Sequence, residues 1–151
     1  MRYTLSLRRP GGGVDHAEGL DEIRYRLHLA TIAAEFGLAD TDLAPALAIV
    51  RTAATASIDL DGGAVVEVEA RRATDQEFTV DRKAVSDRIT EVHRAHAAAI
   101  ADERWDEAAL LLDESGELLD MDAYYLGERF ARIIHRERDR PYTQQDRREL
   151  P

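Results

Sequence analysis

The side chains of this chain that could do chemistry at neutral pH are first of all its five histidines. His93 and His96 stand three positions apart, so a helix would place them near each other. His135 or Glu128 could add a further metal ligand. The spacing matches neither the His-Glu-x-x-His motif of zinc proteases nor the Glu-x-x-His pairs of di-iron bundles. We therefore interpret these histidines as structural, and the sequence predicts no metal and no cofactor.

Hydrolytic and phosphate-binding motifs are also missing. Ser57, Ser86 and Ser115 lie in no nucleophile-elbow context. The run Gly11-Gly12-Gly13 lacks the Lys-Ser/Thr ending of a phosphate loop, and it predicts a flexible turn before a helix. Carboxylates are so numerous that no acid–base pair stands out. We expect a protein that is not an enzyme, with a small enzyme subunit that uses a histidine-containing pocket as one alternative.

The charge pattern is the more informative signal. The net charge of −10 argues against general nucleic-acid binding, which needs clustered basic residues. Residues 102–128 contain ten acidic residues and only Arg104 as a basic one. Residues 129–148 contain seven arginines and three acidic residues. This polarity could attract the opposite ends of identical subunits. The alternative is a solvated helix face whose positive end suits the helix dipole.

Protein-binding residues are therefore predicted on the acidic helical layer and on the basic end with its tail. They are Asp106, Glu107, Asp113, Glu114, Arg136, Arg138, Arg140 and Tyr142.

Composition indicates the broad class of protein. A chain of 151 residues, 44% hydrophobic and 33% charged, is typical of one soluble domain. There is no cysteine to form a disulfide or a thiolate metal site. No apolar run is long enough to span a membrane, and the N-terminus does not resemble a signal peptide. We expect a cytoplasmic protein, with a viral or multi-subunit particle as one setting. A single lysine, Lys83, beside many arginines is typical of a GC-rich bacterial or viral genome.

Hydrophobic periodicity predicts a small sheet with two inserted helices in the first half of the chain. Alternation at residues 3–8 predicts a first strand, and residues 58–70 predict a β-hairpin. Helical spacing predicts a helix over residues 18–36 that ends at Gly37, and a second helix that starts near residue 40. Alternation of Phe78 and Val80 predicts a further strand over residues 76–80.

The second half is predicted to be three antiparallel helices. Asp81 would cap the first of them, and Gly116 would end the second. On the last helix, Leu126, Phe130, Ile133 and Ile134 are expected to be buried. The segment around Trp105, Ala108 and Ala109 resembles one half of a tetratricopeptide-type hairpin over about two dozen residues, but it has no second copy. We interpret it as a common way to pack a helical hairpin, with Trp105, Ala108, Ala109 and Leu112 on one face.

These patterns predict an α+β fold with an antiparallel sheet of three or four strands, two N-terminal helices and a C-terminal three-helix layer. The domain would cover residues 1–138, and residues 139–151 would form a flexible polar tail. We expect a non-enzymatic assembly or adaptor protein that binds protein, including a homo-oligomer as one form. The alternative within the same broad class is an acidic, immunity-type inhibitor that occupies a basic site on its target.

Overall fold

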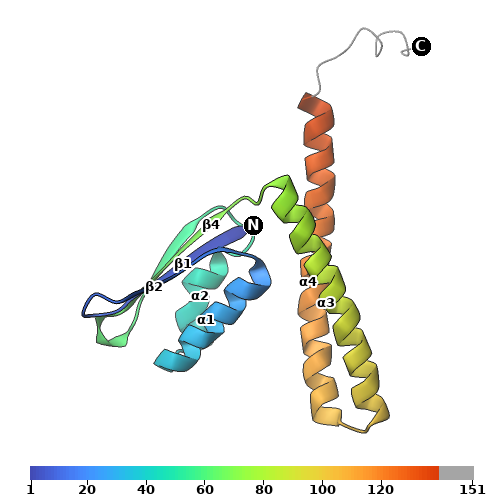
Figure 1. Cartoon of the computed structure of the whole chain (residues 1–151), viewed down its shortest axis with the longest axis horizontal. Helices are drawn as coiled ribbons and strands as arrows, with labels where there is room; N and C mark the ends of the chain where they lie inside the picture. Colours follow the sequence, from blue (N-terminus) through green and yellow to red (C-terminus); the bar gives the residue numbers. More distant parts are fainter. Residues whose placement is uncertain (140–151) are drawn as a thin grey trace. The chain divides into compact units, whose positions relative to one another are not determined.

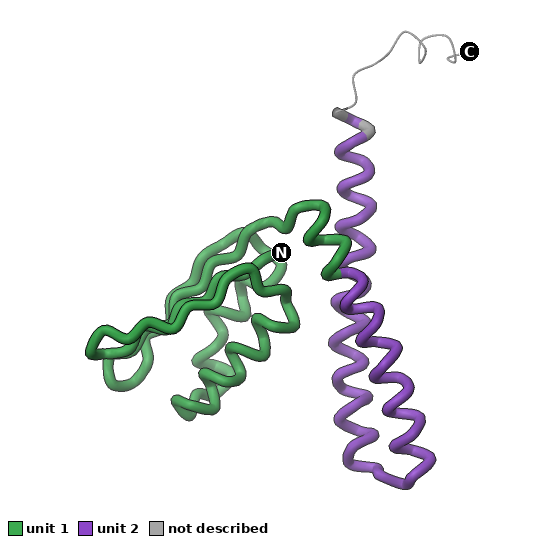
Figure 2. Tube along the Cα trace, in the orientation of Figure 1, with its two compact units in different colours: residues 1–81 green, residues 82–151 purple. Residues whose placement is uncertain are grey.

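The computed structural model describes residues 1–139, except for the side chains of residues 137 and 139. The chain divides into two compact units, Met1–Asp81 and Arg82–Pro151, which we call the N-terminal unit and the C-terminal unit (Figure 2). Each unit is described by itself below. The expected single domain over residues 1–138 stays a prediction, and the expected tail lies outside the described residues from residue 140 onward.

The N-terminal unit is built on a four-stranded antiparallel sheet of order β2-β1-β4-β3 (Figure 1). Its strands are β1 (Arg2–Arg8), β2 (Val14–Leu20), β3 (Thr55–Asp59) and β4 (Val65–Arg71). Tyr3, Leu5 and Leu7 of β1 are buried, while the residues between them are only partly so. Successive side chains of a strand point to opposite faces, so one face of the sheet is apolar and the other polar. The predicted sheet is confirmed.

Strand β2 was not predicted. Gly11 and Gly12 have φ angles of 101° and 98°, and they turn the chain from β1 into β2 instead of leading into a helix. Most residues of β2 are exposed or half-buried, because it is an edge strand. Burial therefore imposes no apolar alternation that the sequence could reveal. The following helix starts at Glu22, four residues later than expected.

Helices α1 (Glu22–Phe36) and α2 (Asp40–Ala48) cover the apolar face of the sheet (Figure 1). The side chain of Asp21 caps α1 by accepting a hydrogen bond from the backbone N–H of Arg24 at 2.8 Å. Gly37 ends the helix in the left-handed conformation, with a φ of 65°, which confirms the predicted stop. The core of the unit lies between these helices and the sheet.

Two stacked tyrosines form the centre of this core. The rings of Tyr3 and Tyr25 are 4.3 Å apart with an interplanar angle of 12°. The Tyr25 hydroxyl donates a hydrogen bond to the Ala46 carbonyl at 2.8 Å, and the Tyr3 hydroxyl accepts one from the Arg51 N–H at 3.1 Å. Both polar ends are thus satisfied inside the core. Burial raises the pKa of Tyr25, so the phenol stays a neutral donor.

Helix α3 (Asp75–Ala101) begins where a strand was predicted over residues 76–80. Thr74 and Glu77 form a reciprocal pair: each side chain accepts a hydrogen bond from the other residue's backbone N–H, at 2.8 and 3.2 Å. This capping box satisfies two of the free donors of the first helical turn. It outweighs the short alternation of apolar residues on which the strand prediction depended.

Asp81 is not the N-terminal cap that the sequence predicted. It lies inside α3, is 2% exposed, and accepts a hydrogen bond from the Arg2 guanidinium at 2.7 Å. Burial is the main cause of its raised pKa, and the positive charge of Arg2 opposes that rise. Asp81 therefore joins α3 to β1 within the N-terminal unit.

Glu77 should make the N-terminal unit sensitive to acid. A hydrogen bond from Arg71, followed by the backbone N–H of Thr74, lowers the pKa of Glu77 to about 2. A carboxyl whose pKa is lower in the folded state stabilises the fold above its unfolded pKa and loses that effect as the pH falls toward its folded pKa. We expect Glu77→Gln to lower the free energy of unfolding by about 1–2 kcal/mol at pH 7. Urea unfolding should show this difference shrink between pH 4.5 and 2.

The rest of α3 and helix α4 (Trp105–Asp139) form a helical hairpin (Figure 1). As far as residue 139, the C-terminal layer therefore has two helices, and the predicted break at Gly116 is wrong. A glycine inside a helix costs about 1 kcal/mol, which the surrounding Ala, Leu and Glu residues offset. The predicted α+β class, with N-terminal helices and a C-terminal helical layer, is confirmed. Among the described helices, none is both long enough and apolar enough to cross a membrane.

Candidate functional site

One side of α4 faces α3. The Ser115 hydroxyl lies 2.9 Å from Nε2 of His93, and Glu114 accepts hydrogen bonds from Arg88. The buried residues of α4 belong to the same side, at spacings of three, four and seven. They are Ala108, Ser115, Leu118, Met121 and Tyr125. On α3, the buried residues Val85, Val92 and Ala99 repeat every seven positions. The two helices thus pack through seams with the spacing of a coiled coil.

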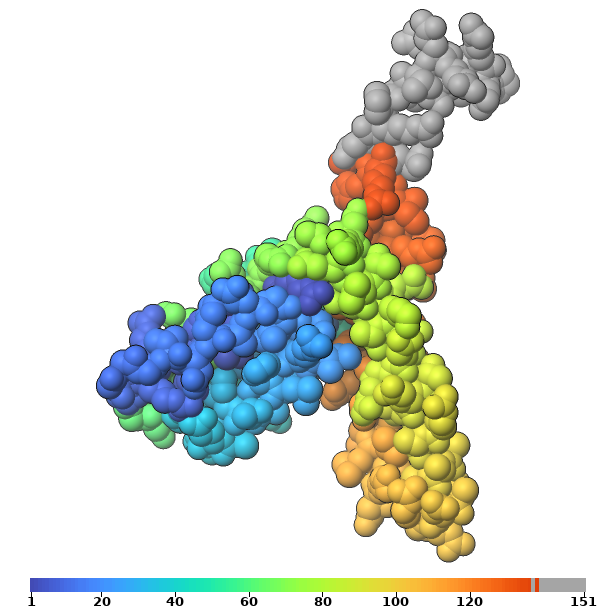
Figure 3. Space-filling model, viewed as in Figure 1, coloured from blue at the N-terminus to red at the C-terminus, as the bar shows by residue number. Residues whose placement is uncertain are grey.

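A second apolar line runs along α4 beside this seam, and it is exposed. Its residues follow one another at alternating intervals of four and three, and we call them the α4 stripe. The stripe consists of Trp105, Ala109, Leu112, Gly116, Leu119, Ala123, Leu126, Phe130 and Ile133. Its six large side chains are between 44% and 62% exposed. In Figure 3 the last turns of α4 extend beyond α3.

The exposure on α4 overturns a prediction. The last helix was expected to bury Leu126, Phe130, Ile133 and Ile134, yet these side chains are 44–65% exposed. Trp105 was expected to share a face with Ala108, yet Trp105 is 62% exposed and Ala108 is 6% exposed. The physical reason is that α4 is apolar on more than one side, while α3 covers only one of them.

The predicted partner-binding residues on α4 lie along the helix and do not converge on one point. Asp106, Glu107, Asp113 and Glu114 belong to its first half, and Arg136 and Arg138 to its last turn. Glu107 pairs with Arg104, and Glu114 pairs with Arg88, whose pKa is raised by that hydrogen bond. Arg140 and Tyr142 lie outside the described residues.

His93 lies at the contact between α3 and α4. His93 is exposed, and its contact with the buried Ser115 joins α3 to α4. Ser115 lies inside a helix and is only 6% exposed, so it is a poor nucleophile for a dissolved substrate. Among the side chains that the structure describes, no group of three or more His, Cys, Asp or Glu residues is placed to hold a metal ion.

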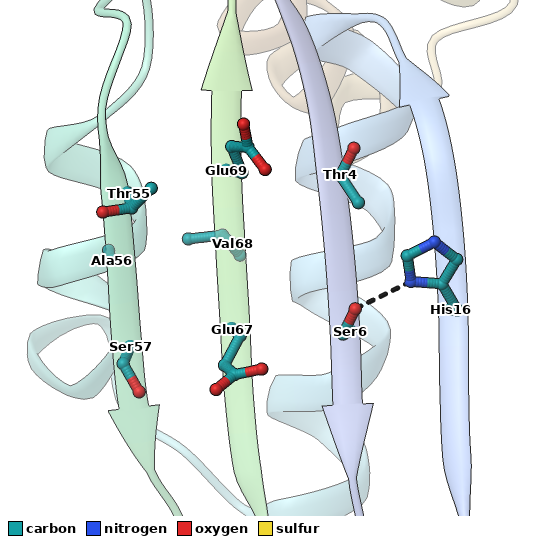
Figure 4. A pocket seen from close by; sticks show the side chains of 9 residues that line it. All are labelled: Thr4, Ser6, His16, Thr55, Ala56, Ser57, Glu67, Val68 and Glu69. Atoms are coloured by element: carbon teal, nitrogen blue, oxygen red, sulfur yellow. Dashed lines mark hydrogen bonds between the residues drawn. The ribbon is translucent and has the colours of Figure 1, made fainter.

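The polar face of the sheet carries an open pocket of about 550 Å³ (Figure 4). Two glutamates of β4 lie between the hydroxyl-bearing residues of the neighbouring strands β3 and β1. The lining residues are Thr4, Ser6, His16, Thr55, Ala56, Ser57, Glu67, Val68 and Glu69. This pocket was not predicted from the sequence. The polar residues that alternate with buried ones along β1 and β4 could have indicated a polar face of the sheet at this place.

A chain of hydrogen bonds at this pocket has the residue types of a hydrolytic triad. The Ser6 hydroxyl lies 2.7 Å from Nδ1 of His16, and Nε2 of His16 lies 2.7 Å from Glu18. Acyl transfer also needs N–H donors aimed at the developing oxyanion. Because β1 pairs with strands on both sides, the backbone N–H groups around Ser6 belong to the sheet ladder. The geometry therefore supports a surface hydrogen-bond network rather than a hydrolytic site.

The fold thus belongs to the α+β class: an antiparallel sheet covered on one face by two helices, followed by a helical hairpin that exposes the apolar α4 stripe. Comparison of the chain with models of known protein families, with curated proteins and with solved structures finds no significant match.

Proposed function

We propose that this chain is a non-enzymatic assembly or adaptor protein that binds another protein subunit through the α4 stripe. The exposure of that stripe is the observation that supports the proposal. Contiguous apolar surface on a soluble protein usually marks an interaction site, because leaving it in water costs free energy. The stripe contains Trp105 and Phe130, and aromatic residues are enriched in the centres of protein interfaces.

The edge of the α4 stripe supports the same proposal. Three aspartates, Asp106, Asp113 and Asp120, each directly follow a large stripe residue. They form a charged rim along one side of the apolar line. An apolar centre with a polar rim is the usual anatomy of a protein interface. The predicted residues Asp106 and Asp113 therefore belong to the rim of this surface.

The acidic inhibitor has less support. Two of its four proposed carboxylates, Glu107 and Glu114, already pair with arginines of the same chain. An incoming basic target would have to compete with those contacts. Binding through the carboxylates alone would also give the apolar α4 stripe beside them no role. We therefore propose the stripe, rather than the carboxylates, as the main binding surface.

Photo-cross-linking in the cells that make this protein tests the proposal. Leu112 on the stripe would be replaced by a photoreactive phenylalanine analogue. Leu110, which is 71% exposed on the opposite side of α4, provides the matched control. We expect discrete adducts of one or few masses from position 112 and few from position 110. Equal labelling at the two positions, or none at either, would contradict the proposed binding surface.

A further inference from the structure

We propose that the partner on the α4 stripe is a second copy of this chain, with the two α4 helices antiparallel. This inference rests on the proposed function and names its partner. The contact would be isologous, since the same surface of both copies forms it around a two-fold axis. Three observations support it: the order of large and small residues in the stripe, a glycine that its own chain does not require, and the charges of the two halves of α4.

The first observation is the order of large and small residues in the α4 stripe. When a second α4 helix runs in the opposite direction beside the first, large residues of one stripe meet small residues of the other. Consider one helix laid against a second copy so that Gly116 lies at the height of Leu119. Ala109 then meets Leu126, and Leu112 meets Ala123. The ends bring Trp105 beside Phe130 of the second copy. Each inner layer combines one leucine with one alanine or glycine, and each outer layer combines two aromatic rings. Such alternation of large and small residues lets two helices interdigitate at nearly constant volume.

The second observation concerns Gly116. A glycine inside a helix is less favourable than an alanine, because its backbone loses more conformational freedom on folding. A Cβ atom added to Gly116 would meet no atom within 4 Å, so packing within the chain does not require a glycine there. In the antiparallel pair, Gly116 lies opposite Leu119 at the centre of the contact. A missing side chain at that point accommodates the leucine of the second copy.

The third observation is the charge of the two halves of α4. Between Trp105 and Asp122 there are seven carboxylates and no basic residue. Between Ala123 and Asp139 there are four arginines and three carboxylates. A parallel pair would place the two acidic halves side by side. In the antiparallel register above, Arg129 lies at the height of Asp106 of the second copy, so the ends of the contact bring opposite charges together. The carboxylates between Asp113 and Asp122 face one another in either direction, so it is the ends of the contact that make electrostatics favour the antiparallel pair.

The α4 stripe is also long enough for stable pairing. In the register above, the paired part of the stripe runs from Trp105 to Phe130, about 38 Å along the helix axis at 1.5 Å per residue. It contains more than three successive seven-residue repeats without a break. Three to four repeats are the usual minimum for a recognisable coiled coil.

Sedimentation of the full-length chain at increasing concentration tests the pair. We expect a monomer–dimer equilibrium that Leu119→Glu weakens by roughly 100-fold, since two copies of the substitution lie at the centre of the contact. Leu110→Glu, on the opposite side of α4, should leave the equilibrium unchanged. Iodide quenching of Trp105, the only tryptophan, should decrease as the dimer forms.

Cysteine cross-linking tests the direction of the helices, because the chain has no cysteine of its own. Chains with Ala109→Cys and chains with Leu126→Cys would be oxidised separately and as a mixture. The antiparallel pair predicts a disulfide in the mixture only, between position 109 of one copy and position 126 of the other.

The two proposals fail in different ways. Disulfides within each separate preparation would show a parallel pair and overturn the antiparallel arrangement. A pure chain that stays monomeric, while position 112 forms adducts with a different protein in cells, would overturn self-association and leave the proposed function standing. A monomeric chain without such adducts would overturn both proposals.

Discussion

Replacing Tyr25 with alanine is expected to lower the free energy of unfolding of the N-terminal unit by about 3–5 kcal/mol, as for other large-to-small aromatic substitutions in cores. Tyr25 is 0% exposed, and it connects three elements: it belongs to α1, stacks on Tyr3 of β1 and bonds to Ala46 of α2. Alanine would remove the stack and leave a cavity and an unpaired carbonyl. This is a large part of the roughly 5–15 kcal/mol by which a typical domain is stable.

The Tyr25→Phe variant separates the contribution of the aromatic ring from that of the hydroxyl group. It keeps the stacked ring and removes only the hydroxyl that bonds Ala46. We expect a loss of about 1–2 kcal/mol, the usual cost of an unpaired buried polar group. Urea unfolding followed by far-UV circular dichroism would measure both variants. An alanine variant no less stable than the phenylalanine variant would show that the stack contributes little.

Two adjacent leucines of α4 are expected to behave oppositely. Leu118 is 3% exposed and Leu119 is 51% exposed. Leu118→Ala should lower the free energy of unfolding of the helical hairpin by about 2–5 kcal/mol, because it opens a cavity in the buried seam. Leu119→Ala should change the stability of the monomer by less than about 0.5 kcal/mol, since its side chain already meets water.

The two variants are compared at low concentration, where the chain is monomeric, so that association does not contribute to stability. Helix content by circular dichroism against urea gives the unfolding free energy. Sedimentation at higher concentration then gives the association constant, which only Leu119→Ala should weaken strongly. Equal stability losses from the two substitutions would show that both sides of α4 are buried in the monomer, and the binding surface would have to be sought elsewhere.

The sequence predicted most of the N-terminal unit because its patterns are local. Tyr3, Leu5 and Leu7 alternate, and so do Val66, Val68 and Ala70, because both strands have one buried and one wet face. Strand β2 was not predicted, because this edge strand lacks the alternation of buried and exposed residues. The start of α3 was missed because Phe78 and Val80 imitate a strand, whereas Thr74 and Glu77 initiate a helix through side-chain bonds to the backbone.

The sequence could predict little of the candidate site. Leucines follow one another at positions 111 and 112 and again at 118 and 119. Consecutive residues of a helix point about 100° apart, so at most one of each pair can face α3 fully. From periodicity alone, the buried residues of α4 and the residues of the α4 stripe are equally good candidates for the core. The charge polarity of α4 was predicted from the sequence, but the apolar residues of its exposed side were predicted to be buried.

The sequence alone predicts the α+β class, the acidic first half and basic end of α4, and the helical nature of residues 82–135. These features depend on local periodicity and on formal charge, which are properties of neighbouring positions. Tertiary contacts, in contrast, determine which side of α4 packs on α3 and which side stays open. That choice depends on Ser115 and Glu114 meeting His93 and Arg88, residues more than twenty positions away along the chain. The α4 stripe is exposed because α3 can cover only one side of a helix that is apolar on two.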